Sequence, residues 1–327
     1  MAHTNPEILW TVAGIFGLLA VAEVLTAILG RLRPALPLTE VKGRIRAWWW
    51  MVGVFSLALL LGSTLSILLF LGLSALAFRE FLQVSGLKPG RQIWLLVIPI
   101  LLLQYLAVYL QWYGAFIIVV PVFAFLMLPL RSLLADDPRD FLRHTGSIHW
   151  GLMATVFCLS HAAFLLILRD PTAPAIRQGP GLMLFLVALT ELNDVSQFLA
   201  GRAFGRRKIL PGISPGKTWA GLAGGVLATS LLAQGLGPLL TPLSRTSLLV
   251  AGLLISLGGF LGDIFFSMLK RDAGVKNAGT LLPGHGGLLD RVDSLVVTAP
   301  LFFHFVYYLV DWQTFGRGVC APFAQLP

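Results

Sequence analysis

The amino-acid sequence predicts an all-α, polytopic integral membrane protein of about ten transmembrane helices, with both termini on the external side. Hydrophobic residues make up 57% of the 327 residues and charged residues only 12%, which leaves too little polar surface for a soluble protein of this length. The apolar residues form long stretches, and the basic residues gather in the loops between alternate stretches. Together these observations predict the fold class and the order of its elements.

Ten apolar stretches follow one another along the chain, at residues 7–30, 47–61, 64–78, 92–111, 114–130, 148–168, 181–201, 218–240, 247–269 and 294–312. Most approach the ~20 residues that a helix needs to cross a hydrocarbon core of ~30 Å. The second and third stretches are short. Residues 47–78 could therefore form one long helix or a hairpin broken at Gly62, Ser63 and Thr64.

The basic residues favour the hairpin, because loops rich in Lys and Arg stay in the cytoplasm. With ten spans and both ends outside, the cytoplasmic loops contain every Lys and Arg except Arg169, Arg177, Arg245 and Arg317. A single span over residues 47–78 would reverse every later loop and remove this bias. We therefore expect a hairpin there, in a multi-pass protein of the cell (inner) membrane.

The densest group of ionisable residues lies between the last two stretches. Acidic and basic side chains between Asp263 and Ser294 surround a Pro-Gly-His-Gly-Gly stretch at residues 283–287. Ionisable groups at a membrane boundary are costly, so such a group indicates a functional site. Acids can hold metal ions, bases can hold phosphates, and a glycine turn lets backbone N–H groups approach an anion closely. This order of residues suggests phosphate chemistry.

The same segment resembles the family of phosphatidate cytidylyltransferases, also called CDP-diacylglycerol synthases. The family pattern runs Ser-x-x-Lys-Arg, four residues, Lys-Asp-x-Gly, three residues, and Pro-Gly-His-Gly-Gly-x-x-Asp-Arg-x-Asp. The residues that match without a gap are Ser267, Lys270, Arg271, Lys276, Gly279, Pro283, Gly284, His285, Gly286, Gly287, Asp290, Arg291 and Asp293. One position departs, because Asn277 stands where the family has Asp.

A second segment agrees with this resemblance. The family's upstream stretch ends in Ser-Pro-x-Lys-Thr, an aromatic or aliphatic residue, Glu or Gln, and Gly. The chain matches it at Ser214, Pro215, Lys217, Thr218, Trp219 and Gly221, while Ala220 replaces the acid or amide. The resemblance covers roughly residues 180–312. It divides the chain into six N-terminal spans (1–180) and a catalytic transmembrane half (181–327) with cytoplasmic loops at 201–217 and 270–292.

Carboxylates from three spans are expected to converge. Asp194 lies near the cytoplasmic end of the seventh span, Asp263 lies in the ninth, and Asp290 and Asp293 open the tenth. Isolated carboxylates in lipid are costly, and convergence at the cytoplasmic side removes that cost. CTP is available on that side, so the active site should face the cytoplasm.

The resemblance implies transfer of a cytidylyl group from CTP to phosphatidate with release of pyrophosphate. Because two anions must react, divalent cations held by carboxylates would neutralise and align them. Mg²⁺ is assigned to Asp194, Asp263, Asp290 and Asp293, and the presence of a second cation beside it stays open. Catalytic contacts are assigned to Asp263, Lys270, Arg271, Asp290 and Arg291. Substrate binding is assigned to Ser214, Lys217, Thr218, Ser267, Lys276, Gly284, His285, Gly286 and Gly287.

The expected partners are CTP, phosphatidate or a related anionic lipid phosphate, membrane lipids, and a second copy in a homodimer; the sequence contains no nucleic-acid-binding motif. Three alternatives stay open. The enzyme could act on another lipid phosphate, such as an ether-linked or polyprenyl-type one. Asn277 and Ala220 could mark a family member with weakened or lost activity. The intramembrane acids could instead serve an ion-coupled transporter.

Overall fold

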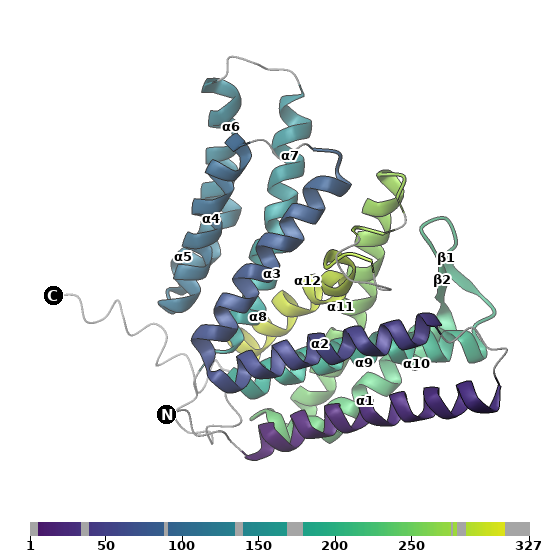
Figure 1. Ribbon diagram of the computed structural model, residues 1–327. Helices are drawn as coiled ribbons and strands as arrows, with labels where there is room; N and C mark the ends of the chain where they lie inside the picture. The colour runs from purple at the N-terminus through teal and green to yellow at the C-terminus, as the bar shows by residue number, and fades with distance from the viewer. Residues whose placement is uncertain are drawn as a thin grey trace.

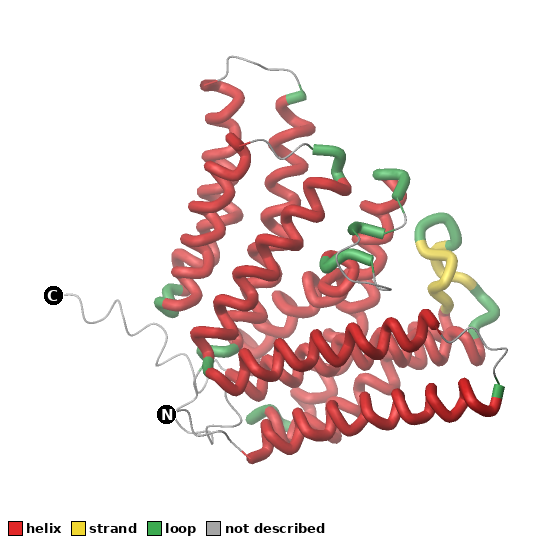
Figure 2. The backbone as a smooth tube through the Cα atoms, viewed as in Figure 1, coloured by secondary structure: helices red, strands yellow, loops and turns green. Residues whose placement is uncertain are grey.

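The computed structural model describes residues 6–33, 39–87, 91–134, 140–168, 179–275, 277–279 and 286–310. Figures 1 and 2 show that most of this chain is helical. Elements labelled η are π-helical segments within longer helices. The elements are α1 (Pro6–Leu32), α2 (Thr39–Leu61), α3 (Ser63–Val84), α4 (Arg91–Tyr109), α5 (Tyr113–Ile118), η1 (Val119–Ala124), α6 (Phe125–Leu134), α7 (Phe141–Leu152), η2 (Met153–Cys158), α8 (Leu159–Leu165), α9 (Gly179–Phe204), β1 (Lys208–Leu210), β2 (Ser214–Thr218), α10 (Trp219–Leu240), α11 (Arg245–Asp272), α12 (Leu289–His304) and η4 (Phe305–Val310).

Eight helices in this part of the chain are long and apolar enough to cross a membrane: Leu9–Leu32, Val41–Leu61, Ser63–Val84, Tyr113–Leu130, Phe141–Leu165, Gly179–Phe204, Trp219–Leu240 and Arg245–Asp272. Each corresponds to one predicted apolar stretch. The stretch at 92–111 forms a shorter apolar helix, Ile93–Tyr109. The last stretch, 294–312, falls on α12 and η4 and continues past the described residues. A helical, polytopic membrane architecture is therefore confirmed.

The break predicted within residues 47–78 is confirmed at Gly62. This residue separates α2 from α3 and has a φ of 120° and a ψ of 168°, a conformation that only glycine adopts without strain. Figure 1 shows the chain changing direction sharply between the two helices. Residues 47–78 consequently belong to two helices.

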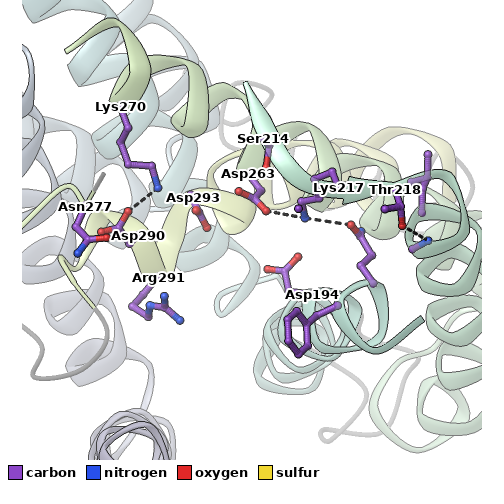
Figure 3. A pocket seen from close by; sticks show the side chains of 15 residues that line it. Asp194, Ser214, Lys217, Thr218, Asp263, Lys270, Asn277, Asp290, Arg291 and Asp293 are labelled. Atoms are coloured by element: carbon purple, nitrogen blue, oxygen red, sulfur yellow. Dashed lines mark hydrogen bonds and ion pairs between the residues drawn. The ribbon is translucent and has the colours of Figure 1, made fainter. Parts of the chain in front are cut away.

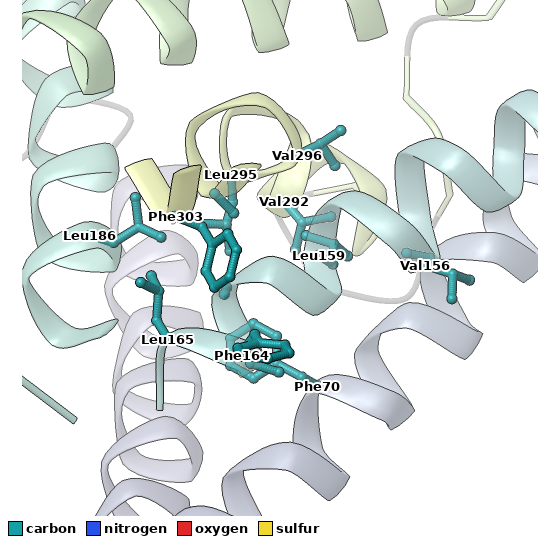
Figure 4. Close-up of a cluster of buried hydrophobic side chains, with 14 of the residues drawn as sticks. Phe70, Val156, Leu159, Phe164, Leu165, Leu186, Val292, Leu295, Val296 and Phe303 are labelled. Carbon is teal, nitrogen blue, oxygen red and sulfur yellow. The ribbon is translucent and has the colours of Figure 1, made fainter. Parts of the chain in front are cut away.

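One hydrophobic core joins helices from both ends of the chain. Helix α12 packs against α8, α9 and α11. Figure 4 shows Phe303 of α12 among Phe164 of α8, Leu186 of α9 and Phe70 of α3, all four of which are buried. This packing places the first turn of α12 next to the helices that carry the other predicted site residues.

The crossing of α11 and α12 depends on a small residue. A Cβ atom at Gly262 would lie only 2.4 Å from the carbonyl oxygen of Asp293 and 2.9 Å from the Cα atom of Ser294. Because lipid tails are as apolar as side chains, membrane helices associate through such close packing and through hydrogen bonds. The close approach brings the backbone of α12 against the turn of α11 that carries Asp263.

A buried amide ties three more helical faces together. Asn193 of α9 is fully buried, and its Oδ1 accepts hydrogen bonds from the hydroxyls of Thr229 on α10 (3.1 Å) and Ser256 on α11 (2.7 Å). Interhelical hydrogen bonds of this kind contribute roughly 0.6–2 kcal/mol each in membrane proteins. They hold α9, α10 and α11 together at Asn193, the residue directly before Asp194.

A short antiparallel hairpin interrupts the helical fold between α9 and α10. Strand β1 pairs with β2, with Leu210 opposite Ser214, inside the segment that was expected to be a loop at 201–217. Strand β2 leads directly into α10, where the Thr218 hydroxyl caps the helix by accepting a hydrogen bond from the Gly221 amide at 3.1 Å. The hairpin therefore has a fixed position relative to α10.

Candidate active site

A charged cavity of about 420 Å³ opens between the hairpin and the helices α9, α11 and α12. Figure 3 shows aspartates and lysines from these elements directed into it. Its lining residues are Asp194, Gln197, Phe198, Ser214, Gly216, Lys217, Thr218, Gly221, Leu222, Asp263, Lys270, Asn277, Asp290, Arg291 and Asp293. Four carboxylates and three cationic groups thus face one space.

The first lysine–aspartate pair joins the hairpin to α11. Lys217 Nζ lies 2.6 Å from Asp263 Oδ2 and also donates to Gln197 Oε1 at 3.2 Å. Ser267, one turn after Asp263 on α11, donates its hydroxyl to Asp263 Oδ1 at 3.3 Å. Both charged side chains are largely shielded from solvent, so the pair is stronger than an exposed surface ion pair.

The second pair joins the end of α11 to the start of α12. Lys270 Nζ lies 2.7 Å from Asp290 Oδ1. The other oxygen, Asp290 Oδ2, accepts the backbone N–H groups of Ala278 at 2.9 Å and Gly287 at 3.0 Å. Asp290 therefore holds a lysine on one side and the two ends of the glycine-rich segment on the other.

Two further carboxylates lie between these pairs. Asp194 accepts a hydrogen bond from the Ser294 hydroxyl at 2.8 Å. Asp293 is close enough to Asp263 and Asp194 to be repelled by both, and Lys270 offsets part of this repulsion. The positive charge of Arg291 attracts the Asp194 carboxylate. Figure 3 shows Asp293 and Asp194 near Asp263, with Lys217 beside Asp263 and Lys270 beside Asp290.

The carboxylates match the oxygen ligands that Mg²⁺ prefers. As arranged in the described residues, however, no three His, Cys, Asp or Glu side chains form a ready-made metal site. Asp263 and Asp290 are each engaged by a lysine. The carboxylate oxygens thus suit Mg²⁺ as ligands. To bind it, Asp263 and Asp290 would have to release their lysine partners.

Most of the predicted site residues come together in this cavity. Those that line it are Asp194, Ser214, Lys217, Thr218, Asp263, Lys270, Asp290, Arg291 and Asp293. Ser267 contacts the site through Asp263. Arg271 is exposed and instead donates from Nε to the Ile213 carbonyl at 3.3 Å, which holds the turn of the hairpin. The predicted contacts Lys276, Gly284 and His285 lie outside the described residues.

The glycines that follow His285 make structural contacts. Gly286 has a φ of 83°, which favours glycine, and a Cβ atom there would lie 2.7 Å from Asp290 Oδ2. Gly287 is buried and packs against Glu80 of α3 and Gly279. The structure shows these protein contacts at both positions, while their predicted contact with substrate stays a prediction.

Glu80 is a site-associated residue that the sequence pattern does not predict. It is 6% exposed, and its Oε2 accepts the backbone N–H of Leu289 at 2.7 Å. Glu80 belongs to α3, far from the motif in sequence, so no local spacing links it to the site. Its only signal in the sequence is an acid directly after Arg79, just past the apolar stretch 64–78.

The fold and the cavity define a helical membrane protein with a charged site suited to phosphorylated ligands. The sequence matches the model of the Cytidylyltransferase family over residues 42–309. The chain therefore belongs to the cytidylyltransferase family, which confirms the resemblance found in its motifs.

Curated relatives support the same family. The chain is 44% identical over 299 residues to "Uncharacterized protein YnbB" of Escherichia coli strain K12, a match that covers 91% of this chain and 98% of that protein. It is 37% identical to the phosphatidate cytidylyltransferase of Haemophilus influenzae, over 40% of this chain and 48% of that protein. The corresponding enzyme of Pseudomonas aeruginosa is 41% identical, over 39% of this chain and 49% of the relative. The chain thus matches about half the length of these two named enzymes.

Proposed function

We propose that this protein transfers the cytidylyl group of CTP to phosphatidate, producing CDP-diacylglycerol and pyrophosphate for phospholipid synthesis. The main observation behind this proposal is that Lys217, Lys270 and Arg291 face four aspartates in the same cavity. Membership of the cytidylyltransferase family supports CTP as the donor. The names of the partial relatives support phosphatidate as the acceptor.

The reaction joins two anions. A phosphate oxygen of the lipid attacks the α-phosphorus of CTP, the bond from that phosphorus to the bridging oxygen of the β-phosphate breaks, and pyrophosphate leaves with the electron pair. The attacking phosphate is already ionised at neutral pH, so the step needs no protein base. The task of the protein is to align the phosphates and to offset their repulsion.

The cations of the cavity suit this task. Lys217 and Lys270 enter from the hairpin and from α11, and Arg291 enters from α12, so phosphates can be contacted from three directions. Asp194, Asp263, Asp290 and Asp293 would hold Mg²⁺. When bound, the cation supplies further neutralisation of the phosphate charge.

The proposed topology has ten spans, both termini outside and the site facing the cytoplasm of the bacterial inner membrane. It rests on the concentration of Lys and Arg in alternate loops. A reporter inserted at Arg206 should be cytoplasmic, and one fused after Pro327 should be external. Finding both reporters on the same side would overturn the topology without affecting the proposed chemistry.

Another lipid phosphate is the second candidate acceptor. Asn277 is exposed and lines the cavity at the position where the family pattern has Asp. The missing negative charge alters the electrostatics close to the reacting phosphates. A lipid phosphate with a different hydrocarbon part, such as an ether-linked or polyprenyl-type phosphate, is the second candidate that we test.

The test uses purified protein in lipid nanodiscs with CTP labelled at the α-phosphate. Phosphatidate, an ether-linked analogue and a polyprenyl phosphate are supplied separately, and labelled lipid is separated by chromatography. We expect label to enter phosphatidate. Label entering only another lipid would establish the second candidate, and no labelled lipid with any acceptor would refute the proposed activity.

A pair of matched variants ties the activity to this cavity. Lys217→Met should lower turnover by about 10²–10³-fold, because it removes one positively charged phosphate contact. Lys208→Met changes an exposed lysine on the other strand of the same hairpin and should leave turnover unchanged. Equal activity of the two variants would place the reaction elsewhere.

A further inference from the structure

The N-terminus of α12 receives a cap from a distant helix. The first N–H groups of a helix have no partner within the helix. Leu288, the residue at the cap position, provides no side-chain hydrogen bond. Glu80 of α3 does so instead, accepting the Leu289 N–H at 2.7 Å across 209 positions of sequence. A carboxylate is also favoured there by the helix dipole.

The surroundings of Glu80 are shaped to hold its carboxylate. The residue is only 6% exposed. A Cβ atom at Gly279 would lie 2.7 Å from Glu80 Oε1, and a Cβ atom at Gly287 would lie 2.5 Å from Glu80 Oε2. Two glycines of the motif, Gly279 and Gly287, are therefore packed against an acid from the N-terminal part of the chain.

Asp290 binds the same two chain segments. Its Oδ2 accepts hydrogen bonds from the amides of Ala278 and Gly287. Gly287 itself and Gly279, the residue after Ala278, pack against Glu80. The two carboxylates thus clamp the described ends of the glycine-rich segment together at the start of α12.

We propose that Glu80 is a positioning residue for the active site. Its carboxylate fixes the first turn of α12, which carries Asp290 and Arg291 and is followed directly by Asp293, and all three residues line the cavity. Glu80 acts through these residues and is absent from the described cavity lining. The consequences for turnover rest on the proposed function, whereas the structural role of Glu80 does not.

Amide hydrogen exchange of the full-length protein in nanodiscs tests the structural role without any substrate. Glu80→Ala should raise the exchange rate of the Leu289 amide by about 10- to 100-fold, because a hydrogen bond to a buried charged acceptor is lost. Gln83→Ala changes an exposed residue on the same helix and should leave that rate unchanged. Unchanged protection of Leu289 in Glu80→Ala would overturn the proposal.

A second pair of variants distinguishes loss of the Glu80 hydrogen bond from general misfolding of Glu80→Ala. Glu80→Gln keeps an acceptor oxygen and should retain most of the protection of Leu289. Gly279→Ala keeps Glu80 but pushes on its carboxylate, so it should raise the exchange rate of Leu289. The opposite pattern, with protection lost in Glu80→Gln and kept in Gly279→Ala, would contradict the hydrogen bond as the cause.

Activity provides the remaining measurement. Glu80→Ala should lower kcat for cytidylyl transfer about 100-fold while changing the KM for CTP much less, since misplacement of reacting groups affects mainly the chemical step. Glu80→Gln should restore kcat to within about tenfold of the parent. Equal kcat values for Glu80→Ala and the parent would refute the positioning role. If the parent itself shows no transfer, the exchange results still decide the role of Glu80, and only the proposed function fails.

Discussion

Replacing Asp263 with Asn removes one negative charge from the centre of the cavity and little else. Asp263 Oδ2 accepts from Lys217 at 2.6 Å, and Oδ1 accepts from the Ser267 hydroxyl at 3.3 Å. An Asn oxygen can still face the lysine, and the Asn amide can donate to the serine, whose hydroxyl both donates and accepts. The shape of the site is therefore preserved in Asp263→Asn.

The effect on folding should be small compared with the effect on turnover. Two charges ~4 Å apart interact by ~4 kcal/mol at an effective dielectric constant of ~20. The side chains of Lys217 and Asp263 are 15% and 28% exposed, and solvent screening reduces the loss of stability to ~1–2 kcal/mol. Lost charge neutralisation at a phosphoryl-transfer site costs ~3–5 kcal/mol, which corresponds to ~10²–10⁴-fold in rate.

The assay measures labelled CDP-lipid formed from CTP and phosphatidate, with thermal unfolding of each variant followed in parallel. Asp272→Asn is the control, because it makes the same substitution at an exposed position of the same helix. We also expect Lys217→Met combined with Asp263→Asn to stay inactive, since Asp263 does more than neutralise Lys217. Turnover of Asp263→Asn within threefold of the parent, or recovery in the double variant, would refute this reasoning.

Three further predictions concern the neighbourhood of the site. Asn277→Asp should raise transfer or lower the Mg²⁺ concentration required, by ~1–3 kcal/mol of added coordination; unchanged Mg²⁺ dependence would make Asn277 a loop-shaping residue. Gly262→Ala should lower the free energy of unfolding by ~1–3 kcal/mol, because its Cβ would meet the Asp293 carbonyl. Gly235→Ala, where nothing lies within 4 Å, should show no such loss in the same thermal unfolding assay. Asn193→Ala should cost ~1–3 kcal/mol, since two interhelical hydrogen bonds are removed, and an unchanged melting temperature would contradict that account.

Local patterns in the sequence predict much of this protein. Apolar stretches identify the helices, and the Gly62 break and the family motif are both visible in short segments. Asp194 and Asp263 were expected to converge because carboxylates in lipid need partners, and the structure brings both to one cavity. These predictions succeed because their physical causes act over a few residues or on one helix face.

The features that were missed depend on contacts between distant segments. Glu80 lies on another helix, and only the three-dimensional packing of α3 against the start of α12 reveals its partner at Leu289. The hairpin was interpreted as a loop, although Pro211 and Gly212 at its turn are a recognisable signal. Arg271 matches the family motif, but its hydrogen bond to the Ile213 carbonyl of the hairpin is visible only in the structure.

The two lysine–aspartate pairs have a thermodynamic consequence for the proposed reaction. A triphosphate that draws Lys217 and Lys270 to itself leaves Asp263 and Asp290 without their present counter-ions. A divalent cation that takes these carboxylates likewise releases the lysines for phosphate. Binding of the nucleotide and binding of the cation must therefore strengthen each other, and by linkage the factor is the same in both directions. Because of these internal ion pairs, the states with both nucleotide and cation bound, or with neither bound, are favoured over the states with only one of them bound.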